Sequence, residues 1–373
     1  MCRIVLVGPT YPLRGGISHY TTLLADALRQ RHEIHLFGFS RQYPDWLYPG
    51  RAQQEPTPTG LPIVTPERTL DGVNPISWWR TARTIRRLSP DCLILQWTVP
   101  YWAPLLWLLL RGVPASTTKL IICHNATPHE VGRAAGLRES VQRALLSRAD
   151  GLICHASSDQ QRLQTMLPQQ RIERVMHPTY APLAAPTNEP THQAGGPHLL
   201  FFGFVRPYKG VDLLLRAMPH VLAAFPEATL TIAGEWWEPS DALLAPLTPH
   251  VRHAITVHDR YIPHDEMAAL FHAADVVVLP YRSATQSGVV QLAFGFGLPV
   301  ITTDVGGLAE AVRHEESGLL VPPNDPQALA DEIIRYVREG WRERLAAGVA
   351  ESRDRFSWDV LVDTVESLCR AND

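Results

Sequence analysis

The chain has 373 residues, of which 45% are hydrophobic and 19% charged, and its formal net charge at pH 7 is −3. This length exceeds the size at which a single hydrophobic core usually stops growing, so we expect two domains. A nucleic-acid partner requires clustered lysine and arginine, which this charge balance does not offer. Composition therefore excludes a nucleic-acid-binding protein, and any phosphate binding must be local.

Short apolar runs recur through the first half, each followed by turn residues and then by a segment with helical spacing. Runs of this kind are typical of parallel strands buried on both faces and joined by helices. The predicted strands are residues 4–7, 34–39, 92–96, 120–123 and 151–154. The first half is therefore predicted to form a doubly wound α/β sheet.

The region between Pro178 and Pro197 loses this periodicity and is rich in Pro, Thr, Ala, Gly and Gln, as exposed linkers are. A second α/β series follows it, with predicted strands at residues 199–202, 229–233, 255–258, 276–279, 300–302 and 318–321. Residues 356–368 have the spacing of an amphipathic helix. We therefore predict one domain over residues 1–185, a second over 196–355, and a terminal helical segment over 356–373.

The predicted strand at residues 199–202 runs into a loop bounded by Gly203 and Gly210, and this loop contains Arg206 and Lys209 before a helix begins. Backbone N–H groups at a helix N-terminus, a guanidinium and an ammonium together can bind a diphosphate. The alternative is a solvated turn with two incidental basic side chains.

Five blocks of the second half, in order, resemble the retaining group 1, or family 4, glycosyltransferases of GT-B architecture. They are residues 203–212, 228–235, 261–281, 302–310 and 317–325. The resemblance implies two Rossmann-like domains facing a cleft, with the terminal helix returning to the first domain. It also implies transfer of a sugar from a UDP-, GDP-, ADP- or dTDP-sugar to a glycan, lipid-linked or other hydroxyl acceptor, as in the synthesis of cell-surface polysaccharides or glycolipids. No cofactor or metal is expected.

The same resemblance assigns roles to individual positions. Arg206, Lys209 and His124 become the predicted catalytic residues, with His124 orienting the donor sugar. The remaining donor-binding residues that the resemblance implies are Gly15, Gly16, Gly203, Gly234, Glu235 and Tyr261; Thr285, Gln286, Ser287 and Gly288 are added from their own polar character, in a loop where the chain departs from the family. For Gly15 and Gly16 a plain tight turn is the alternative, and for His124 a structural histidine is the alternative.

The chain departs from the family at two glutamates that its members commonly carry seven residues apart. The aligned positions hold Ala284 and Leu292. The intervening loop, residues 285–288, could bind a phosphate or sugar hydroxyls, or it could simply cap the following helix. Gln291 would project about 100° away from position 292 on a helix, so we do not treat it as a replacement. The donor base, the sugar and the acceptor therefore stay open.

Two further patterns have functional and structural interpretations. Cys123-His124 and Cys154-His155 end predicted neighbouring strands and could form a zinc site, but strand cysteines are usually inert core residues and we predict no metal. Trp97, Tyr101, Trp102 and Trp107 could pack in the core, face an apolar acceptor or rest on a membrane.

The location of the protein is predicted from its thiols and apolar segments. Five cysteines, odd in number and scattered, are typical of a reducing compartment, so we expect a cytoplasmic protein. Residues 4–7 are too short for the core of a signal peptide, which takes about 7–15 residues. Residues 99–110 contain two prolines and are too short to cross a bilayer, so contact with the inner face of a membrane stays open.

Two other activities remain compatible with the sequence. The missing glutamates are compatible with a non-catalytic protein that binds a nucleotide sugar or a glycan. A phosphorylase or nucleotide-sugar epimerase of GT-B architecture is the second alternative. Release of nucleoside diphosphate together with a heavier acceptor would distinguish transfer from both.

Overall fold

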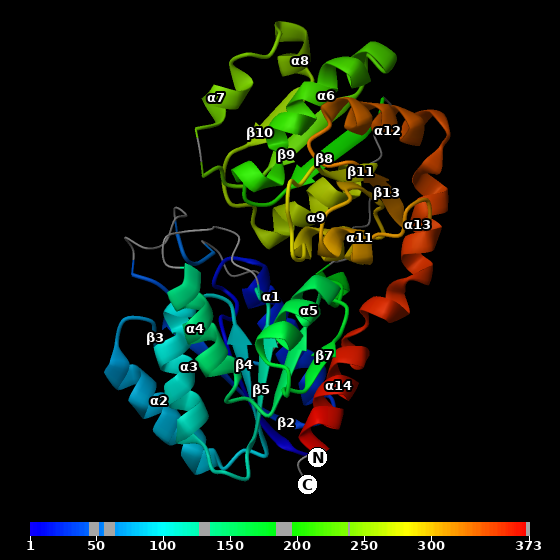
Figure 1. The fold of residues 1–373 in the computed structure, drawn as a ribbon. Helices are drawn as coiled ribbons and strands as arrows, with labels where there is room; N and C mark the ends of the chain where they lie inside the picture. Colours follow the sequence, from blue (N-terminus) through cyan, green and yellow to red (C-terminus); the bar gives the residue numbers. More distant parts are fainter. Residues whose placement is uncertain (45–51, 56–63, 127–134, 184–195, 238, 371–373) are drawn as a thin grey trace. The chain divides into compact units, whose positions relative to one another are not determined.

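The structure is a computed structural model of the chain, and it describes residues 1–44, 52–55, 64–126, 135–183, 196–237 and 239–370 (Figure 1). Its contacts divide the chain into two compact units, one of residues 1–176 with 357–373 and one of residues 177–356. Most of the predicted linker lies outside the described residues. Within the described part of the chain, no helix combines the length and the apolar content needed to span a bilayer.

The first unit is built on a parallel sheet with the strand order β3-β2-β1-β4-β5-β6-β7. Its strands are β1 Arg3–Val7, β2 Glu33–Arg41, β3 Glu67–Asp71, β4 Cys92–Trp97, β5 Thr118–Cys123, β6 Gly151–Cys154 and β7 Ile172–Arg174. All five predicted strands are confirmed. Two strands at the edges were missed: β3 is short, charged and mostly exposed, and β7 has three residues.

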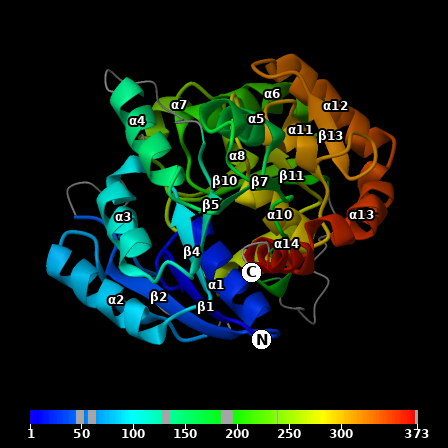
Figure 2. The same ribbon diagram turned by 60° about the horizontal axis from the view of Figure 1, so that its bottom comes forward.

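Helices cover both faces of this sheet. They are α1 Gly16–Arg29, α2 Pro75–Leu88, α3 Ala103–Gly112 with the short 3-10 turn η1 Pro100–Trp102 before it, α4 Ala135–Leu146, α5 Ser157–Met166 and α14 Trp358–Arg370. Figures 1 and 2 show α2, α3 and α4 on one face and α1 and α14 on the other. This arrangement is the doubly wound α/β fold that the sequence predicts.

The terminal helix α14 packs against the first unit, which confirms the predicted return of the chain. It lies beside α1 (Figure 2), where Arg31 forms ion pairs with Asp359 at 2.8 Å and Asp363 at 2.5 Å. At its far end, Leu368 packs over Gly151, where a Cβ atom would lie 3.1 Å from the leucine side chain. A glycine at this position therefore allows close approach of helix and sheet.

The second unit is built on a parallel sheet with the order β10-β9-β8-β11-β12-β13. Its strands are β8 His198–Phe202, β9 Thr229–Ala233, β10 Ile255–His258, β11 Val276–Leu279, β12 Val300–Thr303 and β13 Gly318–Val321. Each matches a predicted strand to within a residue. Its helical segments are η2 Ala181–Leu183, η3 Pro207–Lys209, α6 Val211–Ala224, α7 Ser240–Leu244, α8 Pro249–His253, α9 His264–Ala273, α10 Gly288–Gly295, α11 Gly307–Ala311, α12 Pro326–Arg338, α13 Trp341–Glu351 and η4 Arg353–Phe356.

Candidate functional site

The glycine loop after β8 forms the centre of the candidate site in the second unit. Gly203 follows the strand with φ +104°, a value that L side chains rarely adopt. A Cβ atom on Gly234, at the end of β9, would overlap the carbonyl oxygen of Gly203. Two glycines therefore allow the ends of neighbouring strands to approach closely. The next residue, Glu235, is buried, and its carbonyl accepts a hydrogen bond from the Val205 amide at 3.0 Å.

The Lys209 side chain folds back over this glycine. Its Nζ atom lies 3.1 Å from the position that a Cβ atom on Gly203 would take, and 5.2 Å from the centre of the Tyr281 ring. Lys209 is only 9% exposed, and burial lowers the pKa of its ammonium, with a smaller contribution from the charge of Arg206. No carboxylate of the described residues forms an ion pair with it. A buried cation without a counter-ion is costly, so an anionic ligand at this point would be strongly favoured.

Arg206 lies beside aromatic side chains at the start of the same loop. Its guanidinium carbon is 3.9 Å from the centre of the Trp237 ring and 5.5 Å from that of Tyr208, the geometry of a cation–π contact. It lines a pocket of about 380 Å³ together with Tyr208, Trp236 and Arg282. These aromatic contacts could not be predicted from the sequence, because both tryptophans follow the next strand, β9.

An ion pair fixes the loop from the other side. Arg282 donates to both carboxylate oxygens of Asp212 at 2.8 and 2.6 Å, and also to the Pro207 carbonyl at 2.8 Å. The hydrogen bonds from Arg282 lower the pKa of Asp212. The backbone amide of Arg282 donates to the Tyr208 carbonyl at 2.7 Å. The segment that contains Arg206 and Lys209 is therefore held against the end of β11. This ion pair was not predicted from the sequence, in which its only signal was an acidic residue in the first turn of α6.

The loop of residues 284–288 packs against a second pair of glycines. A Cβ atom on Gly306 would overlap the Ala284 carbonyl, and one on Gly307 would overlap that of Thr285 and lie 2.6 Å from Nε2 of Gln286. The loop also reaches the glycine loop after β8, because Val289 lies 3.4 Å from the Cβ position of Gly203. Residues from the β8, β11 and β12 ends thus meet at one edge of the sheet.

The start of α10 differs from an ordinary capped helix. Ser287 is its N-terminal flanking residue, and its side chain makes no capping hydrogen bond. The following Gly288 lies close to the Tyr180 ring, 3.2 Å from its Cβ position. One turn on, Gln291 is fully buried, and neither its amide nitrogen nor its amide oxygen has a hydrogen-bond partner in the described residues. The backbone amides at the start of α10 thus lack a side-chain cap, and the buried Gln291 amide lacks a partner in the described residues.

The predicted residues of the first unit also gather at the carboxyl ends of strands. Gly15, with φ +112°, precedes α1, and Gly16 begins that helix. His124 follows β5; its Nε2 lies 2.6 Å from Oε1 of Gln96, and its ring meets the edge of Tyr20 at 4.7 Å. Gly15, Gly16 and His124 belong to the first unit, and the other predicted site residues belong to the second.

The two cysteine–histidine pairs are adjacent but do not form a metal site. Cys123 and Cys154 are paired in the β5–β6 register, and both are buried. Burial raises the pKa of the Cys123 thiol, which disfavours the thiolate that a metal requires. The rings of His124 and His155 are 5.7 Å apart. Among the residues that the structure describes, no group of three His, Cys, Asp or Glu side chains could hold a metal ion.

Two family models match consecutive parts of the chain. The model of glycosyl transferases group 1 matches residues 196–339, and that of the glycosyl transferase 4-like domain matches residues 15–179. The D-inositol 3-phosphate glycosyltransferase 1 of Catenulispora acidiphila is 30% identical over 282 residues, which are 70% of this chain and 67% of that protein. The chain belongs to the group 1 glycosyltransferase family.

Other matches within this glycosyltransferase family are shorter. The D-inositol 3-phosphate glycosyltransferase of Frankia alni is 36% identical over 172 residues, which are 44% of this chain and 42% of that protein. Two more relatives of that name are covered over 40% and 37% of their length. The chain thus spans about two fifths of the length of several curated relatives that it matches.

Solved glycosyltransferase structures share the fold of the whole chain. Sucrose-phosphate synthase from Thermosynechococcus elongatus superposes with a TM-score of 0.74 at 21% identity, covering 100% of this chain and 99% of that one. HepE from Anabaena, in complex with UDP and glucose, gives 0.68 at 14% identity and covers both chains fully. These likenesses confirm the predicted GT-B fold.

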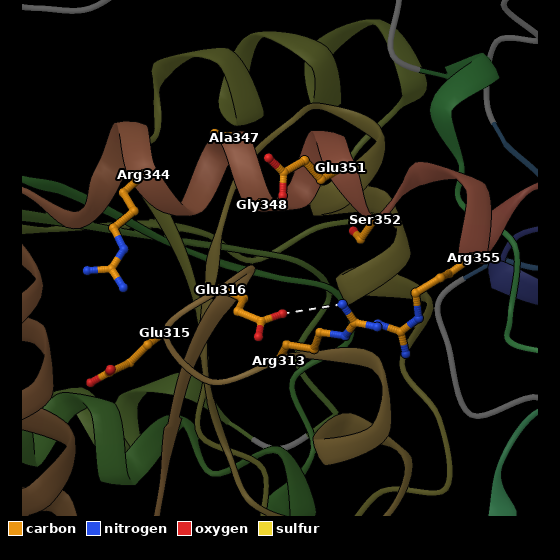
Figure 3. A pocket seen from close by; sticks show the side chains of 9 residues that line it. All are labelled: Arg313, Glu315, Glu316, Arg344, Ala347, Gly348, Glu351, Ser352 and Arg355. Atoms are coloured by element: carbon orange, nitrogen blue, oxygen red, sulfur yellow. Dashed lines mark hydrogen bonds and ion pairs between the residues drawn. The ribbon is translucent and has the colours of Figure 1, made fainter.

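A second pocket of the chain has a different character. It is about 380 Å³ in volume and lies between α13 and the turn after α11 (Figure 3). Three arginines and three glutamates line it, and Arg313 and Glu316, both on the turn after α11, form an ion pair of 3.3 Å. Mixed charges of this kind neutralise one another. The pocket contains none of the predicted site residues, so the donor site is better sought around Gly203.

Proposed function

We propose that this chain transfers a sugar from a nucleoside diphosphate donor to a hydroxyl acceptor with retention of configuration. The observation that carries this proposal is the buried, unpaired ammonium of Lys209 over Gly203, beside Arg206, in a member of the group 1 glycosyltransferase family. A donor diphosphate would supply the missing negative charge. Gly203 and Gly234, which lack side chains, would let its oxygens approach the strand ends, and the adjacent Glu235 is assigned to the donor site as well.

In the proposed reaction, the bond between the anomeric carbon and the leaving phosphate oxygen breaks. A bond from that carbon to the acceptor oxygen forms on the same face, and the acceptor proton passes to the leaving phosphate. Arg206 and Lys209 stabilise the charge that grows on the diphosphate, a kind of contact worth roughly 3–4 kcal/mol per donor. Because two cations supply this charge, we infer that transfer requires no metal.

Sugar and ribose recognition is assigned to the loop of Thr285, Gln286, Ser287 and Gly288. Ala284 and Leu292 provide no carboxylate at the two positions where family members commonly have glutamates. Packing against Gly306 and Gly307 holds the loop in place, and the uncapped start of α10 leaves its amides for a ligand. Tyr261, which follows the edge strand β10, is assigned to the nucleoside end of the donor.

The first domain, residues 1–185, is assigned to the acceptor. Its Gly15 and Gly16 at the start of α1 are assigned to donor binding, and His124, which contacts Gln96, is assigned to the transferred sugar. Residues 196–355 form the donor domain. Relatives are named for D-inositol 3-phosphate and for phosphatidyl-myo-inositol, which suggests a polyol or a lipid-linked acceptor. We place the reaction in the cytoplasm, as the scattered cysteines predict.

A donor panel tests this proposal. UDP-, GDP-, ADP- and dTDP-sugars are added in turn, beginning with UDP-glucose because HepE from Anabaena is complexed with it. The true donor, at about 100 times its dissociation constant, is expected to stabilise the fold by about 2.7 kcal/mol. Incubation with inositol phosphates and lipid-linked sugars should then release nucleoside diphosphate with a heavier acceptor. Binding without transfer or hydrolysis across the panel would instead establish a non-catalytic binding protein.

Lysine acylation locates the diphosphate. The sequence contains only two lysines, Lys119 and Lys209, so mass spectrometry can follow both in one sample. The donor should slow the acylation of Lys209 and leave Lys119 unchanged as an internal control. Equal acylation of Lys209 with and without a donor that is being turned over would refute its assignment.

A further inference from the structure

Two neighbouring helices of the first unit, α2 and α3, form an outer surface that the proposed reaction does not use. They pack closely at Gly112, where a Cβ atom would lie 3.3 Å from that of Ala82 (Figure 1). A groove of about 590 Å³ runs between them. Its lining includes Trp79, Leu108 and three arginines, Arg83, Arg86 and Arg87.

Large apolar side chains project from this surface into solvent. Ile76 is 62% exposed, Trp79 54% and Trp107 41%. Their neighbour Trp78, by contrast, is half-buried, and its Nε1 donates to the Asp71 carbonyl at 2.7 Å. The outward tryptophans therefore have no comparable structural task, and an exposed apolar group beside a groove typically marks an interaction site.

The charge on this surface has one sign. Five exposed arginines belong to the two helices: Arg80, Arg83, Arg86, Arg87 and Arg111. Neither helix contains an acidic residue, and no carboxylate of the described residues pairs with any of the five. Elsewhere, exposed arginines such as Arg3 and Arg41 form ion pairs with acidic neighbours. This face therefore combines five exposed arginines with two helices that contain no acidic residue.

Two of these arginines contact the rings of the exposed tryptophans. The Arg83 guanidinium lies 5.5 Å from the Trp79 ring centre, and that of Arg111 lies 4.6 Å from the Trp107 ring centre. An indole and a guanidinium side by side suit the boundary between lipid headgroups and acyl chains, where rings insert and cations meet phosphates. A soluble polyanion would contact the arginines but would not bury the exposed tryptophan and isoleucine side chains.

We propose that the α2–α3 surface docks the protein on a bilayer that contains anionic lipids. Trp79, Trp107 and Ile76 enter the headgroup region, and the arginines contact lipid phosphates. A cluster of four to eight basic residues with an apolar anchor is sufficient for such binding. This inference does not depend on the proposed transfer reaction, since it rests on helices that contain none of the predicted catalytic residues.

Vesicle sedimentation of the full chain tests the inference. Vesicles of equal parts phosphatidylglycerol and phosphatidylcholine should bind the protein, whereas phosphatidylcholine alone should not, and added salt should weaken binding. Each arginine contributes about five-fold to such an affinity, so Arg86→Gln combined with Arg87→Gln should lower it roughly 25-fold. Arg338→Gln with Arg353→Gln, on exposed arginines of the second unit, is the matched control and should have no effect.

A second variant separates lipid binding from simple charge attraction. Trp79→Ala with Trp107→Ala keeps every arginine and should still lose vesicle affinity, with circular dichroism confirming that it remains folded. Binding of the wild type to soluble polyphosphate but not to the anionic vesicles would overturn the proposal. Equal loss in the α2 double arginine variant and in the control pair would overturn it as well.

Discussion

Substituting Lys209 with methionine should separate stability from function. Methionine has a similar volume and no charge, so Lys209→Met removes a cation that is 9% exposed and lacks an ion-pair partner in the described residues. Because burial lowers the pKa of Lys209 in the folded protein, folding disfavours its charged form. Removing the charge should therefore leave the free energy of unfolding at pH 7 unchanged or increase it. The same change should remove a contact to the donor diphosphate.

The substitution should therefore maintain or raise the free energy of unfolding and lower the turnover. Each unit by which burial lowers the pKa corresponds to about 1.36 kcal/mol of unfolding free energy, and the lost contact with the Tyr281 ring offsets roughly 0.5–1 kcal/mol of that gain. Turnover should fall roughly 100- to 1,000-fold, as for the loss of one charge-stabilising donor. The stability difference should shrink as the pH rises from the lowered pKa of the folded state to 10.5, the ordinary lysine pKa, and be lost above 10.5, where lysine is neutral in both states.

Urea unfolding and steady-state transfer rates measure the two effects on the same preparations. Lys119→Met is the control, since Lys119 lies on β5 beside Asp150 and takes no part in the proposed site. A variant at position 209 that unfolds more readily and transfers sugar at the wild-type rate would refute the reasoning. Such a result would make Lys209 a structural residue of the loop.

Three further predictions follow from buried or crowded groups. Gly234→Ala should lower the free energy of unfolding by roughly 1–3 kcal/mol in urea titrations, because its Cβ would overlap the Gly203 carbonyl, whereas Gly136→Ala, with open space around it, should not. Gln291→Met should raise that free energy by about 1–3 kcal/mol, since its buried amide lacks partners in the described residues; a decrease would show that the amide is satisfied. Burial lowers the pKa of His177 to about 4, so between pH 6.5 and 4 the unfolded state takes up this proton first and stability falls by up to about 1.4 kcal/mol per pH unit. His177→Asn should flatten that slope, and His220→Asn, on the surface of α6, should leave it unchanged.

The sheet strands could be predicted because parallel strands buried on both faces are continuous apolar runs. Residues 92–96 and 276–279 show this clearly, and the structure buries every residue of both. The strand β3, at Glu67–Asp71, was missed because it lies at a sheet edge and exposes its charged side chains. Edge strands lack the two-sided burial that produces the apolar pattern.

The aromatic cluster shows what pattern alone leaves open. The sequence places Trp97, Tyr101, Trp102 and Trp107 within a short segment, with no indication of which are core residues. The structure buries Trp97 and Trp102 and leaves Tyr101 and Trp107 exposed. It also brings Trp79, which had no part in the sequence argument, to the same surface as Trp107 through the contact of α2 with α3. Burial depends on which helix faces meet, and that is a property of packing.

By itself the sequence determined the two α/β domains, the return of the terminal helix and the glycine loop with Arg206 and Lys209. These features depend on local patterns: apolar runs, helical spacing, and glycines where the backbone must turn or approach closely. Only the tertiary structure decided that Lys209 lies buried over Gly203 and that Arg282 clamps Asp212. Only the tertiary structure, likewise, gathers unpaired arginines and tryptophans on one surface. The Arg282–Asp212 pair, the contact of Lys209 with Tyr281 and the contact of α2 with α3 join residues far apart in the chain, so they depend on strand order and side-chain packing that no local pattern encodes.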